Sequence, residues 1–126
     1  MSYTNVVNIA KGQSDWLKGL SFYEDEVYIM ENRLVEVAMK NSSFEARQGV
    51  EHFQNQFVIQ RNHINILKHE IHELEHRLSV DAEKHQGRVD NGFQAEHDVL
   101  DDKFKIFEKL MNELRHEYNT YLTKWM

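Results

Sequence analysis

The chain contains no cysteine and no proline. Without cysteine it can form neither a disulfide framework nor a cysteine zinc site. This fits a reducing compartment, so we expect a cytoplasmic protein. Proline breaks helix interiors and marks loops, so its absence predicts a few long helices with short connections.

Long apolar runs and a basic surface are also missing. No stretch approaches the roughly 18 apolar residues that a membrane span requires, and the N-terminal sequence has neither the basic nor the apolar segment of a signal peptide. The formal net charge is −6, with acidic and basic residues interspersed, whereas nucleic-acid-binding proteins normally show a basic stripe. We therefore expect one soluble domain, residues 1–126, with neither a membrane nor a nucleic acid as its partner.

What the sequence does contain is a strong helical repeat. Apolar residues recur with alternating spacings of three and four, which is the pattern of the buried seam of a coiled coil. All seam positions except Gln13, Gln60 and His97 are apolar or aromatic, although the whole chain is only 40% hydrophobic. The three runs are Val6, Ile9, Gln13, Trp16, Leu20, Tyr23, Val27, Met30, Leu34, Val37; Ala46, Val50, Phe53, Phe57, Gln60, Ile64, Leu67, Ile71, Leu74, Leu78; and Phe93, His97, Leu100, Phe104, Phe107, Met111, Leu114, Tyr118, Tyr121, Trp125.

Two interruptions divide this pattern. Ser42 and Glu45 have the spacing of a capping box with Ser42 as the N-cap, and Asn41 can close the helix before it. The glycine-containing stretch around Asp90 and Asn91 ends one helix and caps the next from one of these two residues. We therefore predict an all-α fold, an antiparallel up-down-up three-helix bundle with coiled-coil-like heptad packing, with helices at about 5–41, 43–86 and 91–125.

The two connections also predict which residues face each other. Tyr23 comes level with Gln60, whose buried amide needs a partner that the tyrosine hydroxyl can supply. Of the two possible handednesses, we prefer the one without contacts between like charges. It pairs Glu70 with Lys103 and Arg77 with Glu96, and it places Glu24 near Arg61 and Glu26 near Arg115. It also turns Gly12 and Gly19 toward the third helix. The topology resembles spectrin-type repeats in architecture alone, which implies no function.

Three polar residues, Tyr23, Gln60 and His97, are predicted to be buried at or beside the seam. A lone histidine in a core is most often structural. The alternative is a pH-sensitive point or a ligand contact, because histidine changes charge near neutral pH. A small-molecule site in a gap near Tyr23, Gln60 and Tyr118 is a further hypothesis.

Histidines and carboxylates offer the only candidate metal chemistry. Glu73-x-x-His76 and Glu113-x-x-His116 resemble the ligand pattern of ferritin-like di-iron bundles, which implies a metal–carboxylate protein that handles oxygen or redox. Here the seam places both histidines on the outermost helical face, and the fourth helix is missing. We therefore expect no metal site and no cofactor. The serines form no nucleophile constellation and no phosphate-binding loop occurs, so we expect no catalytic residue.

Several apolar residues lie off the seam and predict a contact surface. A contiguous exposed apolar patch indicates a partner. We therefore expect a non-enzymatic interaction or scaffold module that forms a homodimer or binds another helical protein, with no small-molecule substrate; the metal–carboxylate protein is the alternative. The predicted surface flanks the groove between the second and third helices and consists of Ile59, Ile66, Val99, Ile106 and Leu110.

Overall fold

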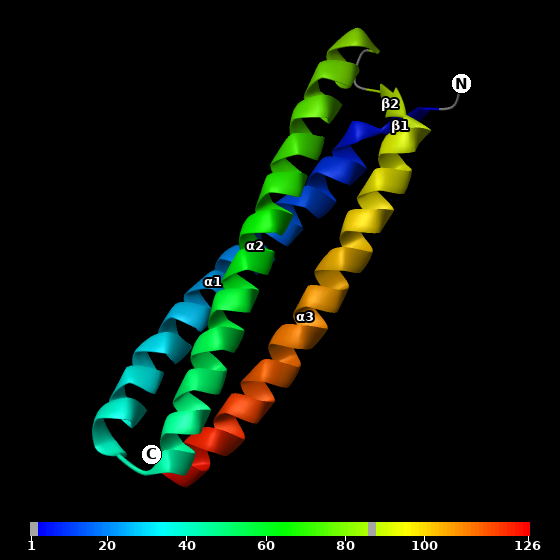
Figure 1. Cartoon of the computed structure of the whole chain (residues 1–126). Coiled ribbons are helices and arrows are strands. Elements are labelled where there is room, and N and C mark those ends of the chain that lie inside the picture. Colours follow the sequence, from blue (N-terminus) through cyan, green and yellow to red (C-terminus); the bar gives the residue numbers. More distant parts are fainter. Residues whose placement is uncertain (1–2, 86–87) are drawn as a thin grey trace.

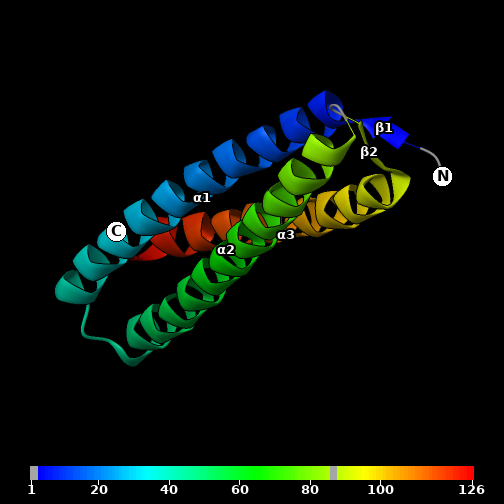
Figure 2. The ribbon, with the colours of Figure 1, turned by 90° about the horizontal axis from the view of Figure 1, so that it is seen from above.

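Three long helices make up almost all of the computed structural model, which describes residues 3–85 and 88–126, with the backbone alone for 3–6 and 88–89. The helices are α1 (Val6–Lys40), α2 (Phe44–Lys84) and α3 (Asn91–Trp125). They form one elongated up-down-up bundle, with the α1–α2 connection and the C-terminus at one end (Figures 1 and 2). This confirms the predicted all-α three-helix bundle. Among the described residues, no helix combines the length and apolarity that a membrane crossing requires.

The helix ends agree with the prediction at all but one cap. The side chain of Asp90 accepts a hydrogen bond from the Gly92 amide at 2.7 Å and caps α3 as predicted. The prediction that Ser42 caps α2 is wrong, because Ser43 holds that position and its Oγ accepts from the Ala46 amide at 3.2 Å. Both serines can cap a helix. With Ser43 as the cap, Ser42 belongs to the connection that leads from Asn41 to α2. The predicted end of α2 at residue 86 lies outside the described residues.

A short β-pairing closes the end of the bundle opposite the C-terminus. Strand β1 (Tyr3–Asn5) pairs antiparallel with β2 (Arg88–Asp90), with Thr4 opposite Val89. Neither strand was predicted from the sequence. Three residues are too few for an alternating pattern to be recognised, and the pairing joins segments that are far apart in the chain.

The core follows the predicted seam closely. Every buried side chain in the described part of the chain occupies a predicted seam position. The seam positions that are only half-buried lie near the helix ends and in the first half of α3; they are Val50, Phe93, His97, Phe104 and Trp125. The heptad pattern therefore identified which face of each helix points inward.

Aromatic side chains fill the end of the core nearest the α1–α2 connection. Phe57 meets Tyr118 edge to face, with ring centroids 5.3 Å apart, and Phe53 meets Tyr121 at 5.1 Å. The two tyrosine hydroxyls are satisfied inside the core. Tyr118 donates to the Met30 carbonyl at 2.8 Å, and Tyr121 donates to the carbonyl of Ala46 at 2.6 Å. These bonds hold α3 against both other helices, because a buried hydroxyl without a partner would be costly.

Ion pairs between helices confirm the predicted handedness. Lys103 donates to Glu70 at 3.0 Å, Arg77 pairs with Glu96 at 2.8 Å, and Arg115 holds both carboxylate oxygens of Glu26. A Cβ atom on Gly12 would meet the ring of His97, and one on Gly19 would meet Phe104, so both glycines face α3 as predicted.

Glu24 and Arg61, which are expected to lie near each other, each bind another partner. Arg61 binds Glu31, one heptad further along α1, while Glu24 accepts from Lys68 at 3.0 Å. Long side chains on a helix lean toward its N-terminus, so on two antiparallel helices they lean in opposite directions. The ion pairs therefore join residues that are further apart along the bundle than a simple folding of the sequence implies.

Gly49→Ala tests the contact between α2 and α3. A Cβ atom there would lie 2.5–2.9 Å from three atoms of the Tyr121 ring, and the ring cannot easily move because its hydroxyl is bonded to Ala46. We expect the free energy of unfolding, measured by chemical denaturation, to fall by about 1–3 kcal/mol, as for other overpacked sites.

The same substitution in a Tyr121→Ala background provides the control. With the ring removed, Gly49→Ala should stabilise the protein by up to about 1 kcal/mol, because alanine has the higher helix propensity. A gain in stability from Gly49→Ala in the unaltered chain would contradict the packing of Tyr121 on α2.

Candidate interaction surface

The five apolar residues predicted to bind a partner lie on the outside of the bundle beside the α2–α3 groove. Their side chains are between 37% and 60% exposed, which is high for aliphatic residues. On each helix they stand next to the seam rather than on it, so the buried face positions them at the mouth of the groove. Ile59 and Ile66 are one heptad apart on α2, as are Val99 and Ile106 on α3.

A hollow of about 290 Å³ lies at the middle of this groove. The core residues Leu67 and Phe107 take part in its lining, together with the exposed Ile66, Ile106 and Leu110. His63 and the pair Glu70–Lys103 complete the lining. The hollow therefore presents apolar, mostly aliphatic side chains flanked by a few charged and polar groups.

Charged pairs bridge the groove on one side of this hollow. Glu70 and Lys103 are joined at 3.0 Å, and Arg77 and Glu96 are joined at 2.8 Å, in each case from α2 to α3. A second hollow of about 340 Å³ lies between these pairs and is lined in part by Val99. All four charged side chains are partly exposed, so each pair stabilises the bundle only weakly, by about 0.2–1 kcal/mol.

The other end of the groove is polar. His52 on α2 and Glu117 on α3 lie 2.7 Å apart, and both are well exposed. Ile59 is exposed on α2 but lines neither hollow. The continuous apolar part of the predicted surface therefore consists of Ile66, Ile106 and Leu110, with Val99 beyond the Glu70–Lys103 pair.

The predicted partnership of Tyr23 with Gln60 is wrong. The hydroxyl of Tyr23 donates to Glu108 of α3 at 2.9 Å, and Gln60 Oε1 lies 3.2 Å from Nδ1 of His63. Burial, and then the hydrogen bond to Glu108, raise the pKa of Tyr23 to about 12. Both residues are buried as predicted. However, Tyr23 points toward α3, because the α1–α3 interface offers a carboxylate just outside the seam.

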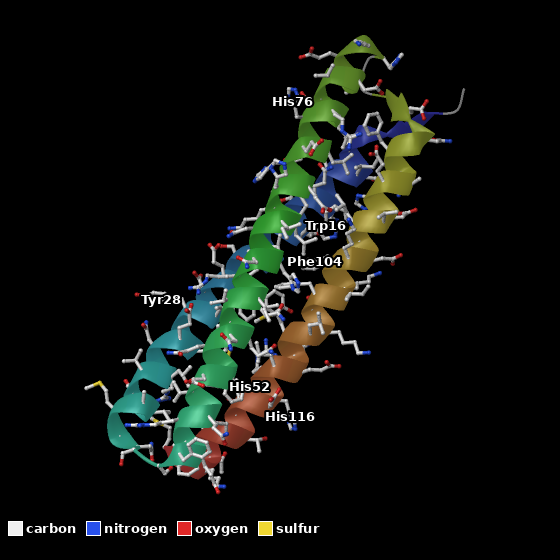
Figure 3. All side chains as sticks on the ribbon, in the orientation of Figure 1. Trp16, Tyr28, His52, His76, Phe104 and His116 are labelled. Carbon is white, nitrogen blue, oxygen red and sulfur yellow. The ribbon has the colours of Figure 1, made fainter. Side chains whose placement is uncertain are left out.

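The polar contact between α1 and α3 repeats after one heptad. In the first unit, the His97 ring packs over Gly12 and stacks on Trp16 with centroids 4.4 Å apart, while the indole Nε1 donates to Asp101 at 3.0 Å. Figure 3 labels Trp16 of α1 and Phe104 of α3. The second unit has the same spacings and consists of Gly19, Phe104, Tyr23 and Glu108. The two glycines were predicted to face α3, but the acceptors Asp101 and Glu108 were not predicted, although their matching seven-residue spacing is visible in the sequence.

His97 is half-buried rather than fully buried. Its ring is fixed by the stack on Trp16, and its Nδ1 atom is enclosed without a hydrogen-bond partner in the described part of the chain. The amide nitrogen of Gln13 is in the same situation. Both expectations for His97, structural or pH-sensitive, stay predictions.

The residues that resemble a di-iron pattern are spread over the surface. Glu73, His76, Glu113 and His116 are all exposed. Figure 3 shows His76 and His116 at opposite ends of the bundle. Within residues 3–85 and 88–126, no three His, Asp or Glu side chains lie close enough together to hold a metal ion.

The hypothetical small-molecule site is not supported by its polar groups. The hydroxyls of Tyr23 and Tyr118 and the amide oxygen of Gln60 are each engaged with other residues of the chain, namely Glu108, Met30 and His63. These three polar groups are therefore already paired within the bundle.

One exposed apolar area was not part of the predicted surface. Phe22 and Ile29 on α1 border a hollow of about 330 Å³ against Arg115 and Asn119 of α3. Their seven-residue spacing is visible in the sequence, but only the handedness of the bundle places them beside α3.

Comparison of the whole chain with protein-family models, with curated proteins and with solved structures found no match.

Proposed function

We propose that this protein is a non-enzymatic interaction module that associates with itself through the α2–α3 groove. The observation that carries the proposal is the cluster of Ile66, Ile106 and Leu110, exposed around one hollow at the middle of the rod. Single exposed aliphatic residues are common on protein surfaces, whereas neighbouring ones around a hollow are typical of a contact surface.

The size and shape of the rod support this proposal. Helix α3, the shorter of the two helices that form the groove, contains 35 residues, so the groove can be about 50 Å long. A groove of that length can bury the roughly 800 Å² per partner that a stable interface needs. The partly exposed ion pairs beside the hollow would form the polar rim around an aliphatic centre. A second copy of the chain carries the same surface, as a two-fold interface requires.

Replacing Ile66 and Ile106 together with glutamate should abolish association. Two charges would have to be desolvated in the complex but would stay in water in the monomer, so the bundle should still fold. Analytical ultracentrifugation at tens of micromolar should show a dimer for the unaltered chain and a monomer for the variant. Circular dichroism should show the same helix content for both.

The control is Tyr28→Glu with Val35→Glu on the outer face of α1. These residues are also one heptad apart and exposed, and the change in net charge is the same. Figure 3 shows Tyr28 on the opposite side of α2 from α3. The control should remain dimeric. If the unaltered chain sediments as a monomer, the groove is not a self-association surface and the proposal is wrong.

A further inference from the structure

We propose that the occupant of the α2–α3 groove is a second copy in parallel orientation, related by a two-fold axis that runs along the groove. This inference rests on the proposed self-association and specifies its geometry. In such a dimer, α2 of each copy lies over α3 of the other. The arrangement of charge across the groove leads to this geometry.

The two cross-groove ion pairs provide the first argument. Glu70 and Lys103 lie at the same height, that is, at the same position along the long axis of the bundle, because they are bonded to each other. The same holds for Arg77 and Glu96. A two-fold axis along the groove exchanges the α2 and α3 sides without changing the height. Glu70 of one copy therefore faces Lys103 of the second copy, and Arg77 faces the second copy's Glu96. All four charges of these two pairs therefore meet an opposite charge, which favours this orientation.

The aliphatic centre provides the second argument. Ile66 lies one turn before Glu70 on α2, and Ile106 lies one turn after Lys103 on α3. Since the helices are antiparallel, both isoleucines lie on the same side of that ion pair and at a similar height around one hollow. The same two-fold axis places Ile66 against the second copy's Ile106, and Ile106 against its Ile66.

An antiparallel dimer fits the surface less well. A two-fold axis across the groove at the isoleucines would reverse the heights. The Glu70–Lys103 pair would then cover the second copy's His63 and Leu110, on the other side of its hollow. Glu70 would then face His63, and Lys103 would be covered by the aliphatic Leu110. Lys103 would therefore lose water without gaining an opposite charge, which is unfavourable.

Cross-linking can distinguish the two orientations directly, because the chain contains no cysteine. One chain carries Ile66→Cys and an isotope-labelled chain carries Ile106→Cys. Each is treated with a short bismaleimide alone and after mixing under conditions that allow subunit exchange. We expect efficient cross-linking in the mixture only, with mass spectrometry showing one labelled and one unlabelled chain in each product.

Charge substitutions provide a second measurement that does not depend on cysteine. Glu70→Lys places four lysines in the parallel interface, and Lys103→Glu places four glutamates there, so each variant alone should dimerise at least about tenfold more weakly. An equal mixture of the two should regain dimerisation as a heterodimer, because lysines then face glutamates.

The possible outcomes separate this inference from the proposed function. A dimer in which each cysteine chain cross-links to itself, with no recovery in the charge mixture, would overturn the parallel geometry and leave self-association intact. A monomeric unaltered chain would overturn both. Cross-linking that occurs only when the two cysteine chains are mixed, together with recovery of a heterodimer from the two charge variants, supports the parallel dimer.

Discussion

Phe57→Ala is expected to lower the free energy of unfolding by about 3–5 kcal/mol, the range found when a buried phenylalanine is truncated. Phe57 is fully enclosed, with 0% of its side chain exposed, and its ring packs edge to face on Tyr118. Tyr118 is in turn held by its bond to the Met30 carbonyl. The surrounding side chains therefore cannot collapse fully into the space left behind. Chemical denaturation followed by circular dichroism measures the loss.

Val58→Ala is the matched control for this substitution. Val58 is the next residue on α2, but it is 47% exposed and points away from the core. Its truncation should change the free energy of unfolding by less than about 0.5 kcal/mol. Equal losses at the two positions would mean that α2 does not bury the face that the structure assigns to it.

Stability should also fall steeply in alkaline solution, because Tyr23 and Tyr118 are buried. Burial and the hydrogen bond to Glu108 raise the pKa of Tyr23 from 10.0 to about 12. Burial raises the pKa of Tyr118 to about 12 as well. Between these values a tyrosine loses its proton in the unfolded chain but keeps it in the folded one. The unfolded state then binds fewer protons than the folded state. The contribution of these tyrosines to the free energy of unfolding is therefore fully present below pH 10 and is lost as the pH rises to 12.

Each of the two tyrosines contributes up to about 1.4 kcal/mol per pH unit in this window. Denaturation at a series of pH values from 8 to about 12 should show the decline, and Tyr23→Phe or Tyr118→Phe should each reduce its slope. Tyr28→Phe serves as the control, since Tyr28 is exposed. An unchanged slope in both core variants would show that these hydroxyls do not titrate with unfolding.

Most of the secondary structure could be predicted because its signals are local. A buried face recurs every three or four residues, and long runs without proline leave few places where a helix can end. The sequence does not decide which of two adjacent serines caps α2. Ser42 and Ser43 have the same chemistry, and which one caps α2 depends on the path of the chain between the helices.

The contacts between helices were only partly predictable. Opposite charges correctly indicated that Glu70 meets Lys103 and that Glu26 meets Arg115. The prediction failed for Gln60, because the length of the sequence between two residues does not determine their relative height once the side chains lean along the helices. The partner of Tyr23 proved to be Glu108, on the helix that no connection joins directly to α1.

The sequence by itself determined the number of helices, their inward faces and the exposed position of Ile59, Ile66, Val99, Ile106 and Leu110, because all of these follow from a repeat within single helices. The tertiary structure alone decided that Ile66, Ile106 and Leu110 share one hollow, while Ile59 stands apart from it. It also decided that β1 pairs with β2 and that Trp16 and Tyr23 donate to acidic residues of α3. These contacts join distant parts of the chain, and their geometry depends on how the helices slide and turn against each other when the core packs.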